Sequence, residues 1–179
     1  MIINVHAGHN PSGKVACGAV GLIDESKEAR RVVEYLIKYL RKYGHTVFDC
    51  TCNNGTSKMN VLKRIVTKCN SRNADLDISI HFNSGACDKK GNKKTTGTEV
   101  YVYRKNSKAL PYAKRIVNNI AGLGFTNRGA KYNNSFYYLK HTKCPALLIE
   151  CCFVDDKDDV DKYNPKTMAK AIADGVGKA

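Results

Sequence analysis

The stretch LDISIHFN, residues Leu76–Asn83, decides the fold. Its alternation of apolar and polar residues and its β-branched isoleucines are typical of a strand that ends on polar side chains. Two other apolar runs end similarly, one at the segment His6–His9 and one, Ala146–Ile149, just before Glu150. Because chemistry in α/β sheets lies at strand ends, we expect several strands to deliver polar groups to one rim, which is how a metal site is built.

The totals fit a single domain with a proper hydrophobic core. The chain has 179 residues, of which 42% are hydrophobic and 26% charged, as in an ordinary soluble globular protein. No apolar run approaches the roughly 20 residues needed to cross a bilayer, so we expect no membrane insertion. The segment Met1–His6 is too short and lacks the basic region of a signal peptide. We therefore expect a first strand there and synthesis in the cytoplasm.

The net charge of +14 predicts anionic partners. Nucleic acid, anionic lipid and an anionic cell-wall polymer all fit the charge, and composition does not choose among them. The sequence has neither an RNA-binding aromatic motif nor a paired-cysteine finger. Eight cysteines occur without a C-x-x-C pair, and we expect most of them to be reduced, buried and structural.

Helical apolar stripes alternate with short β-rich runs along the chain. We expect helices over 25–43, 58–70, 107–120 and 164–175, with Ser107 as a cap of the third. We expect strands over 1–6, 45–50, 76–83, 98–103, 136–139 and 146–150, and a loop over 122–131. This order predicts one α/β domain with a mixed, largely parallel sheet of about six strands and helices on both faces.

His9, Glu25 and His81 form the candidate metal set. Catalytic zinc sites use histidine nitrogen and carboxylate oxygen as three protein ligands and leave a fourth position for water. The spacing is non-local, unlike the compact H-E-x-x-H helix, and is a weak signal by itself. Taken singly, a histidine in a Gly-rich loop is more often a surface residue, and a glutamate opening a helix is more often a dipole or capping residue. The residues alone leave both interpretations open.

Several blocks together resemble the zinc-dependent N-acetylmuramoyl-L-alanine amidases of bacterial autolysins and clostridial phage endolysins. These blocks follow the family's order over nearly the whole chain, and they are Gly8-His9, GLIDE at 21–25, SIHFN at 79–83, GTEV at 97–100, NRGAK at 127–131 and LIE at 148–150. The resemblance implies a peptidoglycan hydrolase that cleaves the amide between N-acetylmuramic acid and L-alanine. It also implies bacterial peptidoglycan as the partner, rather than nucleic acid.

The resemblance also implies roles for particular residues. One zinc ion per chain would be held by His9, Glu25 and His81, and Glu150 would be the catalytic carboxylate that moves a proton from water to the leaving amine. The expected substrate-binding or supporting residues are Asn83, Glu99, Arg128 and Lys131.

Two departures from the family pattern leave rivals. His6 stands where many members have aspartate, which makes it a rival to His9. The Asn-Leu pair common after the metal glutamate is absent, which leaves Glu28 as a weaker rival to Glu25. The pair Cys151-Cys152 could serve as a nucleophile, but no recognisable motif accompanies it.

Two other function classes remain open from the sequence. A zinc peptidase acting on the peptide stem would keep the same ligands, whereas a non-catalytic wall-binding or nucleic-acid-binding module would explain the charge and give His81 and Glu150 no role. We expect residues 1–179 to be a monomeric catalytic domain, with a wall-binding domain following it if the protein is longer. Without a signal peptide, we expect release to the wall through a phage membrane hole or by mother-cell lysis.

Overall fold

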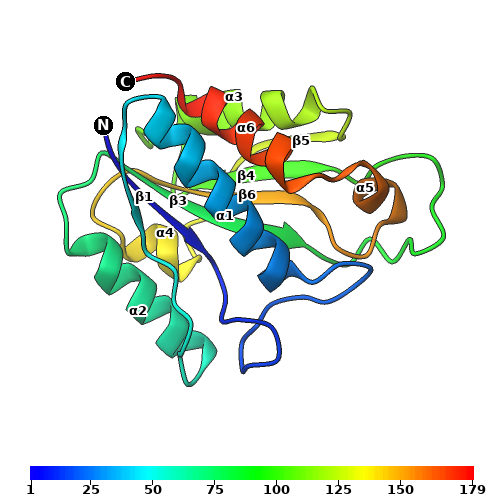
Figure 1. Cartoon of the computed structure of the whole chain (residues 1–179), viewed down its shortest axis with the longest axis horizontal. Coiled ribbons are helices and arrows are strands. Elements are labelled where there is room, and N and C mark those ends of the chain that lie inside the picture. The colour runs from blue at the N-terminus through cyan, green and yellow to red at the C-terminus, as the bar shows by residue number, and fades with distance from the viewer.

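The computed structural model describes residues 1–179 and contains one six-stranded sheet with helices packed against it (Figure 1). The strands run in the order β2-β1-β3-β6-β4-β5. All neighbours are parallel except β4 and β6. The strands are β1 (Ile2–Ala7), β2 (Thr46–Asp49), β3 (Leu76–Asn83), β4 (Thr98–Val102), β5 (Asn127–Tyr132) and β6 (Ala146–Phe153). The single α/β domain with a mixed, largely parallel sheet is therefore confirmed.

There are six helices. Helices α1 and α3 both pack against α6, whereas α2 and α4 lie apart from these three and contact each other (Figure 1). Helix α5 contacts β6. The helices are α1 (Glu25–Lys42), α2 (Lys58–Asn70), α3 (Leu110–Ala121), α4 (Tyr137–His141), α5 (Lys157–Lys162) and α6 (Pro165–Val176). None of them is long and apolar enough to span a bilayer.

The two hydrophobic clusters lie on opposite faces of the sheet. The larger one packs α1, α3 and α6 against one face, and it includes Ile78 and Ile80 of β3. The smaller one lies under α2 and α4 and includes Leu148 of β6. Because successive strand residues point to opposite faces, Ser79 and His81 lie on the α2 and α4 side. The apolar residues of β3 thus anchor the strand while its polar residues face the smaller layer.

Two expected elements were wrong. Residues 137–139 belong to helix α4 rather than to a strand, and Phe136 lies just before it. The side chain of Asn133 accepts the N–H groups of Ser135 and Phe136 in the turn that leads into the helix at Tyr137. The second half of the expected loop over 122–131 is also misassigned, since residues 127–131 belong to edge strand β5. That strand is polar and has no fully buried residue, so it lacks the alternation that marks a half-buried strand.

The start of α3 also differs from the expectation. The helix begins at Leu110 with Pro111 in its first turn, and no side chain caps it. Ser107 lies before the helix, where its Oγ accepts the N–H of Ala109. Helix α5 was not expected at all, because its six residues are mostly charged and show no apolar period.

Candidate active site

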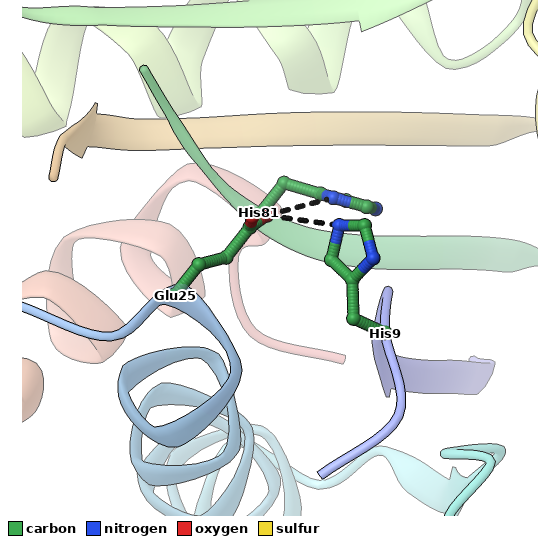
Figure 2. A group of neighbouring side chains, drawn as sticks. All are labelled: His9, Glu25 and His81. Carbon is green, nitrogen blue, oxygen red and sulfur yellow. Dashed lines mark hydrogen bonds and ion pairs between the residues drawn. The ribbon is translucent and has the colours of Figure 1, made fainter. Parts of the chain in front are cut away.

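His9, Glu25 and His81 come from three different elements and meet at one point (Figure 2). His9 follows β1, Glu25 opens α1, and His81 lies near the end of β3. The Nε2 of His9 and the Nδ1 of His81 each lie 3.1 Å from the same Oε1 of Glu25. All three ligand atoms fall within 4.8 Å of one another. The structure therefore brings together the three residues that the sequence singled out.

The carboxylate of Glu25 is held by the backbone as well as by the histidines. Asp24 caps α1 by accepting the N–H of Lys27, which places Glu25 in the first helical position. Its two oxygens accept the N–H groups of Ala19 at 2.7 Å and Phe82 at 3.1 Å. These bonds fix the carboxylate at the rim before any ligand binds.

Two glycines permit the close packing around this group. A Cβ on Gly8 would lie 1.9 Å from the His81 ring, and a Cβ on Gly18 would lie 2.5 Å from Oε2 of Glu25. Gly18 also has a φ of +82°, which favours glycine. The chain therefore leaves out side chains where the metal residues need the space.

The protonation states suit a divalent cation. Burial opposes ionisation of Glu25, but the hydrogen bonds from His81 and His9 outweigh it and hold the pKa of that carboxyl well below its ordinary value. Burial also lowers the pKa of His81. A metal needs neutral imidazole and ionised carboxylate, and tetrahedral zinc ligands are about 3.3 Å apart. The donor set and its 3.1 Å spacings therefore fit zinc.

Glu150 lies beside this group without a partner. It is paired with His81 in the register of β3 and β6, and its buried Oε2 makes no hydrogen bond. Burial, followed by the charges of Glu25 and Glu99, raises the pKa of Glu150 to about 8. A buried carboxyl whose pKa lies near neutrality is suited to taking up and releasing a proton.

Glu99 is the centre of a second polar cluster, on the β4 and β5 side of Glu150. Its side chain is buried, and it accepts hydrogen bonds from Asn83 and Arg128, each at 2.9 Å, and from Lys131. Burial opposes its ionisation, but Lys131, Arg128 and a neighbouring tyrosine outweigh burial and lower the pKa of Glu99. The four residues expected to support the substrate thus form one connected group.

Tyr101 completes this cluster and was missed by the sequence analysis. Its hydroxyl donates to Oε1 of Glu99 at 2.8 Å. The only sequence signal was its position two residues after Glu99 in a strand, which puts both side chains on one face.

The rivals lie outside the metal group. His6 is buried, with Nδ1 3.3 Å from the carbonyl oxygen of Ala7. Glu28 accepts hydrogen bonds from Arg31 and Tyr163. Cys151 and Cys152 are fully buried, and burial raises the pKa of both thiols, which leaves no thiolate nucleophile there; all eight cysteines are free thiols.

A cavity of about 340 Å³ opens beside the metal group. It is bordered by His9, His81 and Glu150, and its other walls come from α2, α4 and the segment before α4. The candidate active site therefore has a metal group and a basic carboxyl, with a cavity on one side and the Glu99 cluster on the other.

Two histidines at the strand ends of an α/β sheet, a carboxylate that opens a helix and an unpaired carboxyl beside them form an arrangement found in metal-dependent hydrolase sites. A family model described as N-acetylmuramoyl-L-alanine amidase matches residues 2–179. The chain belongs to this family, and the resemblance seen in the sequence is confirmed.

Two relatives are similar in sequence to this chain. An uncharacterized protein of Clostridium perfringens is 40% identical over 185 residues, covering 99% of this chain and 52% of that protein. The N-acetylmuramoyl-L-alanine amidase LytC of Bacillus subtilis is 35% identical over 121 residues, covering 64% of this chain and 23% of LytC. The chain spans about half the length of the first of these relatives and less of the second.

The solved structures include a similar catalytic domain. The catalytic domain of the CD27L endolysin targeting Clostridia difficile matches with a TM-score of 0.86 and 32% identity, covering 98% of this chain and 96% of that one. Cwp6 from Clostridium difficile matches with a TM-score of 0.81 and 27% identity, covering 98% of this chain and 28% of that one.

Proposed function

We propose that this chain is a zinc-dependent amidase that cleaves the bond between N-acetylmuramic acid and L-alanine in peptidoglycan. The observation that carries the proposal is the His9, Glu25 and His81 group beside the unpaired Glu150, in a chain that belongs to the amidase family. One zinc ion per chain would be held by these three residues. The same residues would serve a peptidase of the peptide stem, so the scissile bond needs its own test.

A zinc ion held by His9, Glu25 and His81 would supply Lewis-acid chemistry, polarising the scissile carbonyl and lowering the pKa of the attacking water toward neutrality. Glu150 accepts the proton of the attacking water on its free Oε2 and returns it to the nitrogen of the leaving L-alanine. The pKa of about 8 belongs to the metal-free protein, and the charge of bound zinc would lower it, so that the carboxylate is ionised when it accepts this proton. Glu25 and His81 are held in place by the backbone and by each other, so little reorganisation accompanies the reaction.

The Glu99 cluster binds the anionic peptide side of the substrate. Arg128 and Lys131 are each about one-third exposed, at 35% and 38%, while both are held by buried Glu99. Each cation therefore has donors left for a carboxylate of the peptide stem. Asn83 and Glu99 position these cations and do not need to touch the substrate.

The proposal extends to the domain organisation, the oligomeric state and the location of the protein. Residues 1–179 are the catalytic domain, monomeric in its action, and a longer protein would carry a wall-binding domain in addition. The protein is made in the cytoplasm and reaches the wall after release, either through a phage membrane hole or by lysis of the mother cell. The positive charge brings it to the anionic wall.

The test is to digest purified peptidoglycan and identify the new amino termini. We expect N-terminal L-alanine, lost after treatment with a zinc chelator and restored by added zinc, with Glu150→Gln as a control of low activity. Another stem residue at the new terminus would make the enzyme a stem peptidase. No release from any of several wall types would leave a non-catalytic binding module.

A further inference from the structure

Four residues that border the cavity beside the metal group each carry a buried polar atom without a hydrogen-bond partner. These atoms are Nε2 of His6, Oγ of Ser79, the hydroxyl of Tyr138 and Oε2 of Glu150. The side chains of the first three are almost fully buried, with exposed fractions of 1%, 0% and 2%. Because unpaired buried polar atoms cost free energy, their gathering on one cavity indicates a binding site. The proposed mechanism uses only Glu150.

The fold places the other three residues side by side. His6 of β1 and Ser79 of β3 are direct neighbours in the parallel register, on the face covered by α2 and α4. Tyr138 of α4 packs edge-on against His6, with 4.6 Å between the ring centroids. We call His6, Ser79 and Tyr138 the floor of the cavity. Ser79 lies two residues before His81 in β3, on the same face of the sheet, so the floor is adjacent to the pair of His81 and Glu150.

The floor is uncharged and offers both acceptors and donors. Burial, followed by the charge of His81, lowers the pKa of His6 to about 3, so its ring is neutral. Its Nδ1 faces the carbonyl oxygen of Ala7, which assigns the proton to Nδ1 and leaves Nε2 as an acceptor. Burial raises the pKa of Tyr138, so its hydroxyl, like that of Ser79, remains a donor.

The walls above this floor are apolar. Val61 and Leu62 of α2, together with Phe136, border the same cavity. The only lysine among the lining residues is Lys58. An anionic ligand would therefore find no compensating charge in this cavity other than Lys58. A neutral group with one donor, one acceptor and a methyl fits this lining.

We propose that this cavity binds the 2-acetamido group of the muramoyl sugar, with His6, Ser79 and Tyr138 as residues that determine specificity. The acetamido N–H matches the acceptor of His6, its carbonyl oxygen matches the hydroxyl donors, and its methyl matches the apolar walls. The inference rests on the proposed function.

The chemistry of the sugar agrees with this placement. The acetamido group is on C2, next to C3, whose lactyl ether carries the scissile carbonyl, so the two groups lie close together. The cavity borders His9, His81 and Glu150 over β1, β3 and β6. The Glu99 cluster lies on the other side, over β4 and β5, where the peptide would leave. The sugar and the peptide thus take opposite sides of Glu150.

The test compares two substrates of equal charge with the zinc-loaded enzyme. One is N-acetylmuramoyl-L-alanyl-D-isoglutamine, and the other carries a hydroxyl in place of the acetamido group at C2. We expect kcat/KM for release of N-terminal L-alanine to be higher for the acetamido substrate by at least about tenfold. N-acetylmuramic acid alone should likewise inhibit wall hydrolysis at a lower concentration than its 2-hydroxy analogue.

Two variants assign the preference to the floor. Tyr138→Phe and Ser79→Ala should each reduce the ratio of the two kcat/KM values, whereas Tyr35→Phe, which removes a hydroxyl from α1, should leave it unchanged. A loss of structure lowers both values together and does not move the ratio.

The outcomes separate the inference from the proposed function. Equal cleavage of both substrates, or equal inhibition by the two sugars, would mean that the floor holds only water, and it would overturn the inference while the amidase stands. An unchanged ratio in both floor variants would also overturn it. If neither the substrates nor purified walls release L-alanine, the proposed function fails, and the inference fails with it.

Discussion

At the scale of single residues, the site depends on how four carboxyl and imidazole groups share one buried space. Glu25 is ionised because two histidines and two backbone N–H groups donate to it, while Glu150 has no donor and keeps its proton to about pH 8. In the metal-free protein Glu25 is therefore ionised and Glu150 neutral at neutral pH, and the positive charge of bound zinc would lower the pKa of Glu150 toward the ionised form that a general base needs.

Replacing His81 and replacing Glu150 should have different effects. His81→Ala removes a ligand and should lose zinc and activity together. Glu150→Gln should keep about one zinc per chain and lose on the order of 100-fold or more in turnover, since it removes only the proton carrier. Metal analysis and wall hydrolysis on the same preparations measure both effects. Full zinc in His81→Ala would remove that residue from the ligand set.

The raised pKa of Glu150 makes the metal-free protein sensitive to pH. Between its ordinary value of 4.5 and about 8, the folded state holds a proton that the unfolded state has lost, so stability falls as pH rises through this range. Glu150→Gln should therefore raise the Tm of the metal-free protein by on the order of 5 °C at pH 8 and by nothing at pH 4. Thermal denaturation of both proteins across this pH range measures the difference in Tm. A difference that is the same at every pH would contradict the titration of Glu150 as its cause.

Much of the residue-level site was accessible from the sequence. His9, Glu25 and His81 could be singled out because they lie in or next to recognisable elements near strand ends, and the resemblance to the amidase family decided between a metal set and ordinary polar residues. The connection of Glu99 to Tyr101, and the floor that includes Tyr138, could not be found. Both depend on which side chains meet across elements distant in sequence, and no local pattern encodes that.

At the scale of elements, the loop between β1 and α1 fits around the metal group. Gly18 and Gly13 lie in this loop with nearly the same positive φ, +82° and +81°. A Cβ would collide with Glu25 at Gly18, whereas nothing lies within 4 Å at Gly13. The two positions therefore have the same backbone strain and differ only in contact with the site.

This pair gives a matched test of the loop. Gly18→Ala should weaken zinc binding by at least about tenfold, because displacing the carboxylate of Glu25 disturbs a ligand, as with other changes to groups that orient metal ligands. Gly13→Ala should cost about 1 kcal/mol of stability from the positive φ and leave zinc affinity unchanged. Zinc titration of both variants is the measurement, and equal affinities would mean that the loop does not support the site.

The elements that the sequence misassigned are those whose neighbours decide their form. Helix α4 begins just after a turn in which the side chain of Asn133 accepts two backbone N–H groups. Strand β5 pairs with β4 at the edge of the sheet and has no apolar face. The strand β3 and the helix α1, with strong apolar periods, were anticipated closely. Local pattern thus suffices where the apolar period is strong and fails where a side-chain hydrogen bond in the preceding turn or an edge pairing decides.

At the scale of the whole molecule, the net charge of +14 should affect the rate at which the protein associates with the wall and not the rate of bond cleavage. Long-range attraction to an anionic wall is screened by salt, with a Debye length of about 10 Å at 0.1 M and 3 Å at 1 M. Raising the salt concentration over this range should slow hydrolysis of intact walls several-fold and leave hydrolysis of a small neutral muramyl peptide nearly unchanged. Parallel rate measurements check this, and equal slowing of both substrates would show that charge does not act through the wall.

The overall architecture was predictable because alternating helix and strand patterns leave few ways to bury both faces of a sheet. The direction of β4 could not be predicted, since nothing in its residues marks it. This strand runs antiparallel to β6 and parallel to β5. That reversed strand brings Glu99 opposite Glu150 and so completes the site.

The most direct test of the metal centre is to locate zinc by anomalous scattering in crystals of the zinc-loaded protein. We expect one peak per chain, about 2.0–2.2 Å from Nε2 of His9, Oε1 of Glu25 and Nδ1 of His81. A zinc peak on His6 or among the cysteines, with none at these three atoms, would contradict the assignment of the centre.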